Sequence, residues 1–147
     1  MSGLDGTDKE ILRILQKQGR ISMKELGGQV SLSQPAVADR VRKLEDRGIV
    51  QQYGAIISPK AVGKPIAAYL MFLTKDCEKF VEFCRESPEL MECHRISGQY
   101  NFLLKVVTES LQTLETFTNA CGKFGDSVTL VVMSSPVEHK PLLPPFD

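Results

Sequence analysis

The stretch ISMKELGGQVSLSQPAVADRVRKLEDRG, residues 21–48, decides how the N-terminal part of the chain folds. Ser22 and Glu25 have the spacing of a capping box, in which each side chain bonds the other residue's backbone N–H, so a helix is expected to begin there. Ser33 is a good N-cap for a further helix, and Pro35 falls in its first turn, where a missing N–H costs little. A tight turn therefore joins two short helices.

A third helix is expected before this stretch. Thr7 and Glu10 have the form of another capping box, an apolar face follows at helical spacing, and Gly19 ends the helix. Three short helices with a tight turn between the second and third predict a helix-turn-helix domain.

The last of these helices has an apolar stripe and a basic flank. At 100° per residue, the stripe is Val37, Val41 and Leu44, and Gly48 stops the helix. Asp39 precedes Lys43 by one turn, which predicts an i,i+4 ion pair. A solvated helix face is the simpler interpretation of such charges, but the surrounding motif favours a DNA-reading surface. The predicted DNA contacts are Ser22, Ser33, Gln34, Ala36, Arg40, Lys43 and Arg47.

The C-terminal half alternates between strand and helix patterns. Their order, βαββαβ, predicts a ferredoxin-like domain in which two helices cover one face of a four-stranded antiparallel sheet. The fold class is therefore α+β. The expected elements are strands 66–73, 90–97, 100–107 and 128–137 and helices 77–87 and 110–124.

The two halves predict a chain of several parts. Residues 49–57 have β-branched residues and partial alternation, which predicts a strand leaving the first domain. The expected division is a helix-turn-helix domain with connecting strand over 1–58, a linker over 59–64, a dimerisation and effector domain over 65–137, and a tail over 138–147. The proline-rich tail either ends loosely or clasps a neighbouring subunit.

The sheet also predicts self-association. Residues 100–107 and 129–133 are apolar at both odd and even positions, whereas strands half exposed to water alternate. Helices shield one face, so a second sheet or another subunit is expected to cover the other, and a self-complementary dimer is the simplest source of that cover.

Composition narrows the function classes without choosing one. Residues 1–58 carry nine Lys and Arg against seven Asp and Glu, and residues 59–147 carry nine against eleven, a small asymmetry with the sign expected for a nucleic-acid-binding N-terminal half. No apolar run has the length of a membrane span. The four cysteines lack metal-ligand spacing and are expected to be free thiols. No metal, cofactor or catalytic residue is expected, and the expected location is the cytoplasm.

The sequence resembles the Lrp/AsnC (feast/famine) family of prokaryotic transcription regulators over roughly residues 4–137. The matching stretches include residues 8–15, 19–22, 25–26, 32–33, 40–41, 48–50 and 53–55, with Gly63. The resemblance implies a winged or strand-extended helix-turn-helix that binds double-stranded DNA. It also implies nucleoid association, and dimers that assemble into octamers or other higher oligomers.

The resemblance further implies an amino-acid effector site at the turn 97–101. The expected effector residues are Gly98, Gln99, Tyr100, Asn101 and Thr129. Family members that bind amino acids commonly have Asp where this chain has Asn101, and an amide can hydrogen-bond an ammonium group but cannot pair with its charge.

Three alternatives stay open at this stage. One is a ligand-independent, DNA-organising member of the same family. Another is an RNA-binding protein, although the sheet lacks the second aromatic platform and the basic residue that such proteins use. The last is a small enzyme, for which His94 and Glu92 could form a pair, but no nucleophile stands at a suitable spacing.

Overall fold

The computed structural model describes residues 3–144, and the chain contacts divide it into two compact units. The first comprises residues 3–55 together with 137–144, and the second comprises residues 56–136. The chain therefore leaves the first unit once and returns to it at its C-terminal end.

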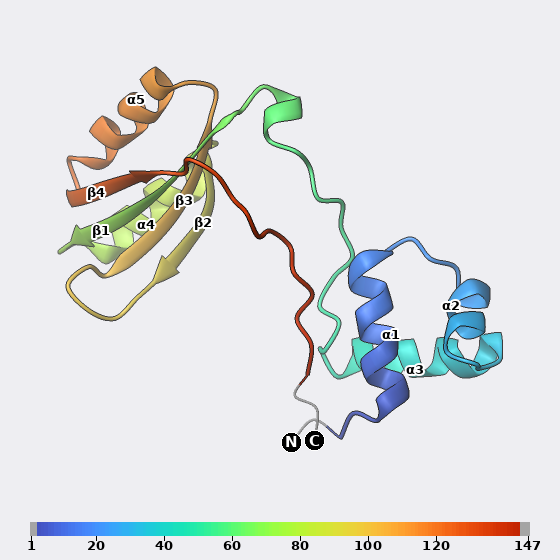
Figure 1. Cartoon of the computed structure of the whole chain (residues 1–147). Helices are drawn as coiled ribbons and strands as arrows, with labels where there is room; N and C mark the ends of the chain where they lie inside the picture. The colour runs from blue at the N-terminus through green and yellow to red at the C-terminus, as the bar shows by residue number, and fades with distance from the viewer. Residues whose placement is uncertain (1–2, 145–147) are drawn as a thin grey trace. The chain divides into compact units, whose positions relative to one another are not determined.

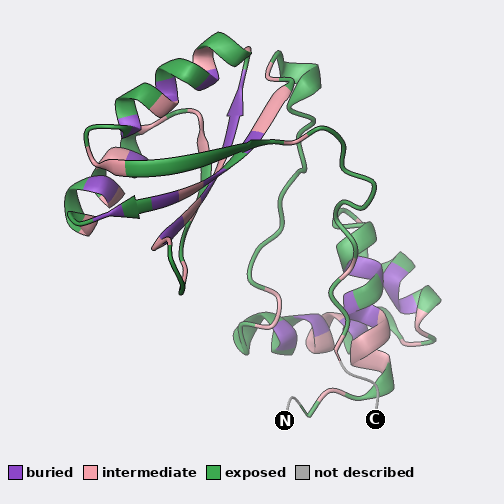
Figure 2. Cartoon of the chain, turned by 60° about the vertical axis from the view of Figure 1, so that its left-hand side comes forward, coloured by how far each residue is buried: buried purple, intermediate pink, exposed green. Residues whose placement is uncertain are grey.

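The first unit contains the three short helices that the sequence predicts (Figure 1). They are α1 (Gly6–Lys17), α2 (Met23–Gln29) and α3 (Gln34–Asp46). Their apolar faces meet in one core, which includes Ile11, Leu26, Val37, Val41 and Leu44, all at most 4% exposed. Figure 2 marks the buried residues of these helices in purple. The burial of one stripe on each helix holds the helix-turn-helix together.

The predicted caps of α2 and α3 are confirmed, and that of α1 is wrong. The Ser22 hydroxyl accepts from the Glu25 N–H, and the Glu25 carboxylate accepts from the Ser22 N–H. The Ser33 hydroxyl likewise caps α3. Helix α1, however, begins before Thr7, because Asp5 and Asp8 form its capping box. A pair of aspartates can form a capping box just as a hydroxyl and a glutamate can. The sequence therefore contained two overlapping signals for the start of this helix, Asp5 with Asp8 and Thr7 with Glu10.

The turn between α2 and α3 depends on a glycine. The Leu32 N–H donates to the Gly27 carbonyl at 2.9 Å, which folds the chain back onto α2. A Cβ at Gly27 would stand 2.6 Å from the Leu32 carbonyl oxygen. The close approach of the two backbones therefore requires glycine at this position.

The expected connecting strand over 49–57 is not formed, and the part of the chain between residues 3 and 65 contains no β-strand. The residue pattern of this segment is typical of an extended strand. A strand also requires backbone partners, however, and a single copy of the chain supplies none here. A short 3₁₀ helix, Lys60–Val62, follows it.

The second unit is the predicted βαββαβ arrangement. It consists of β1 (Ile66–Thr74), α4 (Cys77–Glu86), β2 (Leu90–Arg95), β3 (Phe102–Thr108), α5 (Leu111–Cys121) and β4 (Gly125–Val131). All neighbours in the sheet are antiparallel and the strand order is β2-β3-β1-β4. This order places β2 and β4 at the two edges.

The last strand begins and ends earlier than the sequence predicts. Gly125 pairs with Thr74, and pairing ends with Val131 opposite Ala68 and one further bond from the Val132 N–H to the Ala67 carbonyl. A Cβ at Gly125 would stand 2.0 Å from the Leu73 carbonyl, so only glycine lets the two strands start this close. The apolar pattern continues past Val131, but the pairing with β1 stops at Ala68, before the start of β1 at Ile66.

The two faces of the sheet differ. Helices α4 and α5 lie on one face (Figure 1), over a core that includes Leu70, Phe72, Phe80 and Leu104, all fully buried. The other face carries apolar side chains that stay 36–48% exposed in the single chain, namely Tyr69, Leu73, Val128 and Leu130.

Candidate DNA-binding and effector sites

One side of α3 is buried and the other is exposed. The stripe of Val37, Val41 and Leu44 is at most 4% exposed, so it faces the domain core. Ser33, Gln34 and Ala36 are exposed at the N-terminal end, and Lys43 and Arg47 are exposed further along. Ser22, at the start of α2, is also exposed, with its hydroxyl engaged in the cap. The helix thus presents a polar and cationic surface of the kind that enters a DNA groove.

Asp39 organises two of the cations on this surface. Its carboxylate contacts Lys43 Nζ and an Arg42 guanidinium nitrogen, each at 2.6 Å. The hydrogen bonds from Lys43 and then from Arg42 lower the pKa of Asp39 below its usual value. The predicted i,i+4 pair with Lys43 is confirmed. Arg42, 69% exposed, was not predicted, although its i,i+3 spacing from Asp39 is visible in the sequence.

Arg40 lies in a different environment from Lys43. Its Nη1 contacts the carboxylates of Asp5 at 2.7 Å and Asp8 at 2.8 Å, and its side chain is 33% exposed. The bond from the Asp8 N–H and then that from Arg40 lower the pKa of Asp5. Arg40 therefore joins α3 to the first turn of α1, and only part of its guanidinium edge is available to another partner.

The turn expected to hold an effector is closed by backbone bonds. The Ile96 N–H donates to the Asn101 carbonyl at 3.1 Å, and Gly98 has a φ of 113°, which other residues rarely adopt. Gln99 is exposed and Tyr100 is half-buried. Gly98 and Gln99 thus stand at the accessible tip of the turn.

Asn101 has a structural partner. Its amide nitrogen donates to the Thr74 carbonyl at 2.8 Å, and its amide oxygen accepts from the Thr74 N–H at 3.1 Å. Thr129 is not near this turn in the single chain, because it pairs with Leu70 on the edge strand β4, and β1 separates β4 from β3. The structure therefore groups residues 98–101 and leaves Thr129 apart from them.

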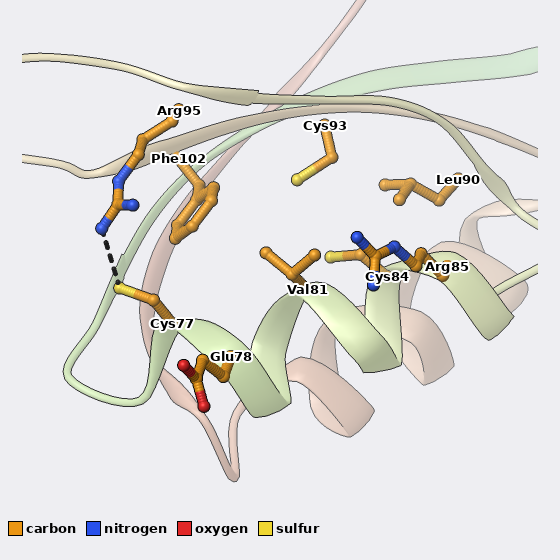
Figure 3. A pocket seen from close by; sticks show the side chains of 9 residues that line it. All are labelled: Cys77, Glu78, Val81, Cys84, Arg85, Leu90, Cys93, Arg95 and Phe102. Carbon is orange, nitrogen blue, oxygen red and sulfur yellow. Dashed lines mark hydrogen bonds between the residues drawn. The ribbon is translucent and has the colours of Figure 1, made fainter.

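A cavity of about 620 Å³ opens between α4 and β2, beside the same turn (Figure 3). Arg95 donates to the Cys77 sulfur at 3.5 Å and lies 5.8 Å from the centroid of the Phe102 ring. Cations at Arg85 and Arg95 suit a carboxylate, and Val81, Leu90 and Phe102 suit an apolar group. Sequence reasoning missed this cavity, since its lining comes from a helix and two strands that meet only in the fold. The lining residues are Cys77, Glu78, Val81, Cys84, Arg85, Leu90, Cys93, Arg95 and Phe102.

The four cysteines are free thiols. Burial raises the pKa of Cys84 and that of Cys121 to about 12, so both thiols are protonated at neutral pH. Over residues 3–144, no group of three or more His, Cys, Asp or Glu side chains is placed to hold a metal ion. In the same part of the chain, no helix has the length and apolarity that crossing a membrane requires.

His94 lies on β2 beside Glu92. The two side chains pair at 3.1 Å, and Lys105 contacts the same carboxylate at 3.1 Å, so the pKa of Glu92 is lowered by His94 first and Lys105 second. All three residues lie on the open face of the sheet. The pair is a surface ion cluster with no nucleophile in it.

Comparisons with known proteins agree with both units. Residues 4–51 match a family model described as winged helix-turn-helix DNA-binding, and residues 72–142 match one described as Lrp/AsnC ligand binding domain. The chain is 43% identical over 136 residues to the uncharacterised HTH-type transcriptional regulator YezC of Bacillus subtilis, covering 92% of this chain and 98% of the relative. It is 37% identical over 133 residues to the regulator LrpC of the same species, covering 89% and 92%.

Solved structures show the same arrangement of elements. The structure of Bacillus subtilis LrpC superposes with a TM-score of 0.88 at 35% identity and covers 93% of this chain and 99% of its own. A transcriptional regulator of Neisseria meningitidis in complex with L-Met also gives a TM-score of 0.88, at 28% identity over 95% of this chain and 96% of its own.

Fold and surface together define a helix-turn-helix DNA-binding regulator with a separate α+β ligand-binding domain. The chain belongs to the Lrp/AsnC family of transcription regulators.

Proposed function

We propose that this regulator binds duplex DNA as a dimer, placing the α3 helices of two subunits in successive major grooves. The observation that carries the proposal is the exposed polar and cationic side of α3, opposite a fully buried stripe. A dimer spaces two recognition helices by about one helical turn of DNA, which allows a two-fold site to be read. Such a protein acts on the chromosome, in the cytoplasm and in association with the nucleoid.

The DNA contacts divide into two groups. Gln34 and Ala36, near the N-terminus of α3, are placed to meet base edges, with Ser22 and Ser33 at the starts of α2 and α3. Lys43 and Arg47 supply phosphate contacts, which strengthen binding without selecting sequence. Arg40 also contributes to DNA binding, while its guanidinium group stays bonded to Asp8.

The dimer forms through the open face of the sheet. This face exposes apolar side chains of β1 and β4 whose register brings Tyr69 opposite Leu130 and Met71 opposite Val128. Apolar side chains on neighbouring strands make a continuous patch, which a second copy can cover isologously. Further association of dimers into an octamer or another higher oligomer follows the same family pattern.

The effector is an amino acid held at the turn 97–101 and the adjoining cavity. Gly98 exposes backbone groups to a ligand, and Arg95, which lines the cavity, has donors suited to a carboxylate (Figure 3). The Neisseria meningitidis relative was crystallised with L-Met, which supports this ligand class.

Footprinting on its own promoter region, with and without single amino acids, tests the function. We expect paired protected half-sites about one helical turn apart, and a change in the pattern with at least one amino acid. An Arg95→Met variant should lose the amino-acid response and keep the footprint, while Arg20→Met, on the DNA-binding unit outside the cavity, should keep the response. Absence of protection on any duplex would contradict DNA recognition, and absence of calorimetric heat with every amino acid would contradict the effector.

A further inference from the structure

The C-terminal tail of the chain is bound to the DNA-binding unit. The side-chain amide of Gln16, near the end of α1, donates to the Leu142 carbonyl at 2.9 Å and accepts from the Leu142 N–H at 2.7 Å. A side-chain amide has the same donor and acceptor as a peptide group, so Gln16 pairs with Leu142 as a neighbouring strand would. The contact joins residues 126 positions apart in the sequence.

The tail forms one wall of an apolar groove of about 660 Å³ within this unit. The other walls come from the residues just before α1, from α1 itself and from the segment that follows α3, and they include Leu4, Leu12, Leu15, Ile49, Val50 and Tyr53. The Tyr53 hydroxyl donates to Glu45 at 2.8 Å, which fixes one wall to α3. The folded domain therefore supplies one side of the groove, and the tail closes the other.

The tail residues contribute unequally to the contact. The side chain of Leu142 is 84% exposed, so this residue binds through its backbone alone. Leu143 is 39% exposed and Pro144 is half-buried, and both line the groove. The segment thus combines two backbone hydrogen bonds with two apolar side chains.

We propose that residues 141–144 are a docking segment for this groove, so that the DNA-binding unit is attached to the regulatory domain at two points. One attachment is the chain that leaves the first unit after Ala55, and the other is the docked tail, which continues from β4 through residues 132–140. A prolyl residue at 141 restricts the backbone next to the bonded Leu142 and lowers the entropy that docking must overcome.

Docking leaves the DNA-reading surface available. The groove is lined by α1 residues, by residues 49–53 and by the tail itself, whereas Gln34, Lys43 and Arg47 lie on α3. The tail therefore acts as a restraint on the DNA-binding unit and does not compete with DNA. A second attachment narrows the range of separations that two recognition helices can span, an effect that rests on the proposed function.

Hydrogen exchange of the full-length protein, measured by mass spectrometry without DNA, tests the docking itself. We expect the amide of Leu142 to exchange at least about tenfold more slowly than in Gln16→Met, a variant of similar length and helix propensity that has neither partner for the peptide. Gln29→Met, on α2 outside the groove, is the matched control and should exchange like the wild type.

Two tail variants form a second matched pair. Leu143→Asp places a charge in the apolar groove and should raise the exchange of Leu142 as Gln16→Met does, whereas Leu142→Asp, at the exposed side chain, should not. Equal exchange in the wild type, Gln16→Met and Gln29→Met would overturn the proposal, as would equal effects of the two aspartates.

Binding to duplexes whose half-sites are separated by stepwise insertions tests the restraint. Deletion of residues 137–147 should leave affinity for one half-site within about twofold and flatten the dependence on separation. If the deletion left the dependence of affinity on half-site separation unchanged, the proposed restraint would be overturned. If the wild type bound none of these duplexes, the proposed function would fail, and the exchange measurements would still decide the docking.

Discussion

Asn101 binds both backbone polar groups of Thr74 through its side-chain amide, donating to the Thr74 carbonyl at 2.8 Å and accepting from the Thr74 N–H at 3.1 Å. The backbone N–H of Asn101 also donates to the Phe72 carbonyl at 3.0 Å. The residue therefore fastens the start of β3 to the end of β1, next to the turn proposed to bind an effector. A residue selected for effector binding by resemblance has a structural role that its position in the sequence does not reveal.

An aspartate at position 101 should destabilise the regulatory domain. Asn101→Asp keeps the acceptor for the Thr74 N–H but loses the donor to the Thr74 carbonyl, and a carboxylate oxygen would face that carbonyl instead. We expect the free energy of unfolding to fall by about 1–3 kcal/mol, because a part-buried carbonyl loses its partner. Urea unfolding at pH 7 measures the change, and Asn119→Asp, at an exposed position of α5, should change stability far less.

The Asn101→Asp variant also tests whether residue 101 contacts the amino-acid ligand. If the charge of an aspartate can reach an ammonium group, calorimetry should show tighter amino-acid binding by Asn101→Asp than by the wild type despite its lower stability. Equal or weaker binding would mean that the bonds to Thr74 hold residue 101 away from the ligand.

Local patterns predicted most of the fold correctly. The caps at Ser22 and Ser33 and the stripe ending at Leu44 each depend on residues within a few positions of one another, so the sequence displays them directly. The order of strands and helices after residue 65 also follows from local periodicity. The helix-turn-helix pattern itself predicted DNA binding, and family resemblance added the expectation of an amino-acid ligand.

The wrong or missed predictions concern features that depend on contacts between residues far apart in the sequence. The end of β4 depends on where its pairing with β1 stops, and an extended segment at 49–57 cannot become a strand without a partner. The bonds of Arg40 to Asp5 and Asp8 and of Gln16 to Leu142 join residues more than 30 positions apart, for which a single sequence carries no signal. The cavity beside Arg95 depends on the same kind of long-range contact.

A pair of adjacent glycines tests the helix-turn-helix turn. Gly27→Ala should destabilise the DNA-binding unit by about 1–3 kcal/mol, because its Cβ would meet the Leu32 carbonyl oxygen at 2.6 Å and the turn must shift. Gly28→Ala, in the same helix with no atom within 4 Å of the new Cβ, should stabilise it by about 0.5–1 kcal/mol. Thermal unfolding of both variants measures the difference. Similar shifts for both alanines would argue against a tight approach at Gly27.

Lys43 tests the assignment of phosphate contacts. Lys43→Ala should weaken binding to specific and non-specific duplexes by similar factors and should lower the slope of log affinity against log salt by about one. Gel-shift titrations over a range of salt concentrations provide both values. Lys60→Ala, on the 3₁₀ helix outside this surface, is the control and should leave the slope unchanged. A loss of sequence preference with an unchanged slope would instead indicate that Lys43 contacts a base.

Arg40 has to be tested together with its partner Asp8. Arg40→Ala removes both the ion pair and a cation near DNA, whereas Asp8→Asn removes only the carboxylate and leaves the cation. We expect Arg40→Ala to reduce operator affinity about tenfold or more if the guanidinium contacts a base, and Asp8→Asn to reduce it less. Gel-shift affinities of the two folded variants decide between the roles. Equal losses would restrict Arg40 to holding α3 against α1.

The pH dependence of stability should reveal the cap of α1. The bond from the Asp8 N–H, and then that from Arg40, lower the pKa of Asp5 below its ordinary value of 3.8, so the unfolded chain binds a proton at this group more readily than the folded chain. The contribution of Asp5 is therefore complete above about pH 5 and is lost as the pH falls through the lowered pKa. Asp5→Asn still caps the helix but has no charge for Arg40. The difference in urea midpoint between the wild type and Asp5→Asn should stay constant between about pH 6 and about pH 5 and shrink as the pH falls from about 5 toward about 3, since the other titrating groups are common to both proteins. A constant difference over this range would mean that the charge of Asp5 adds nothing to the cap.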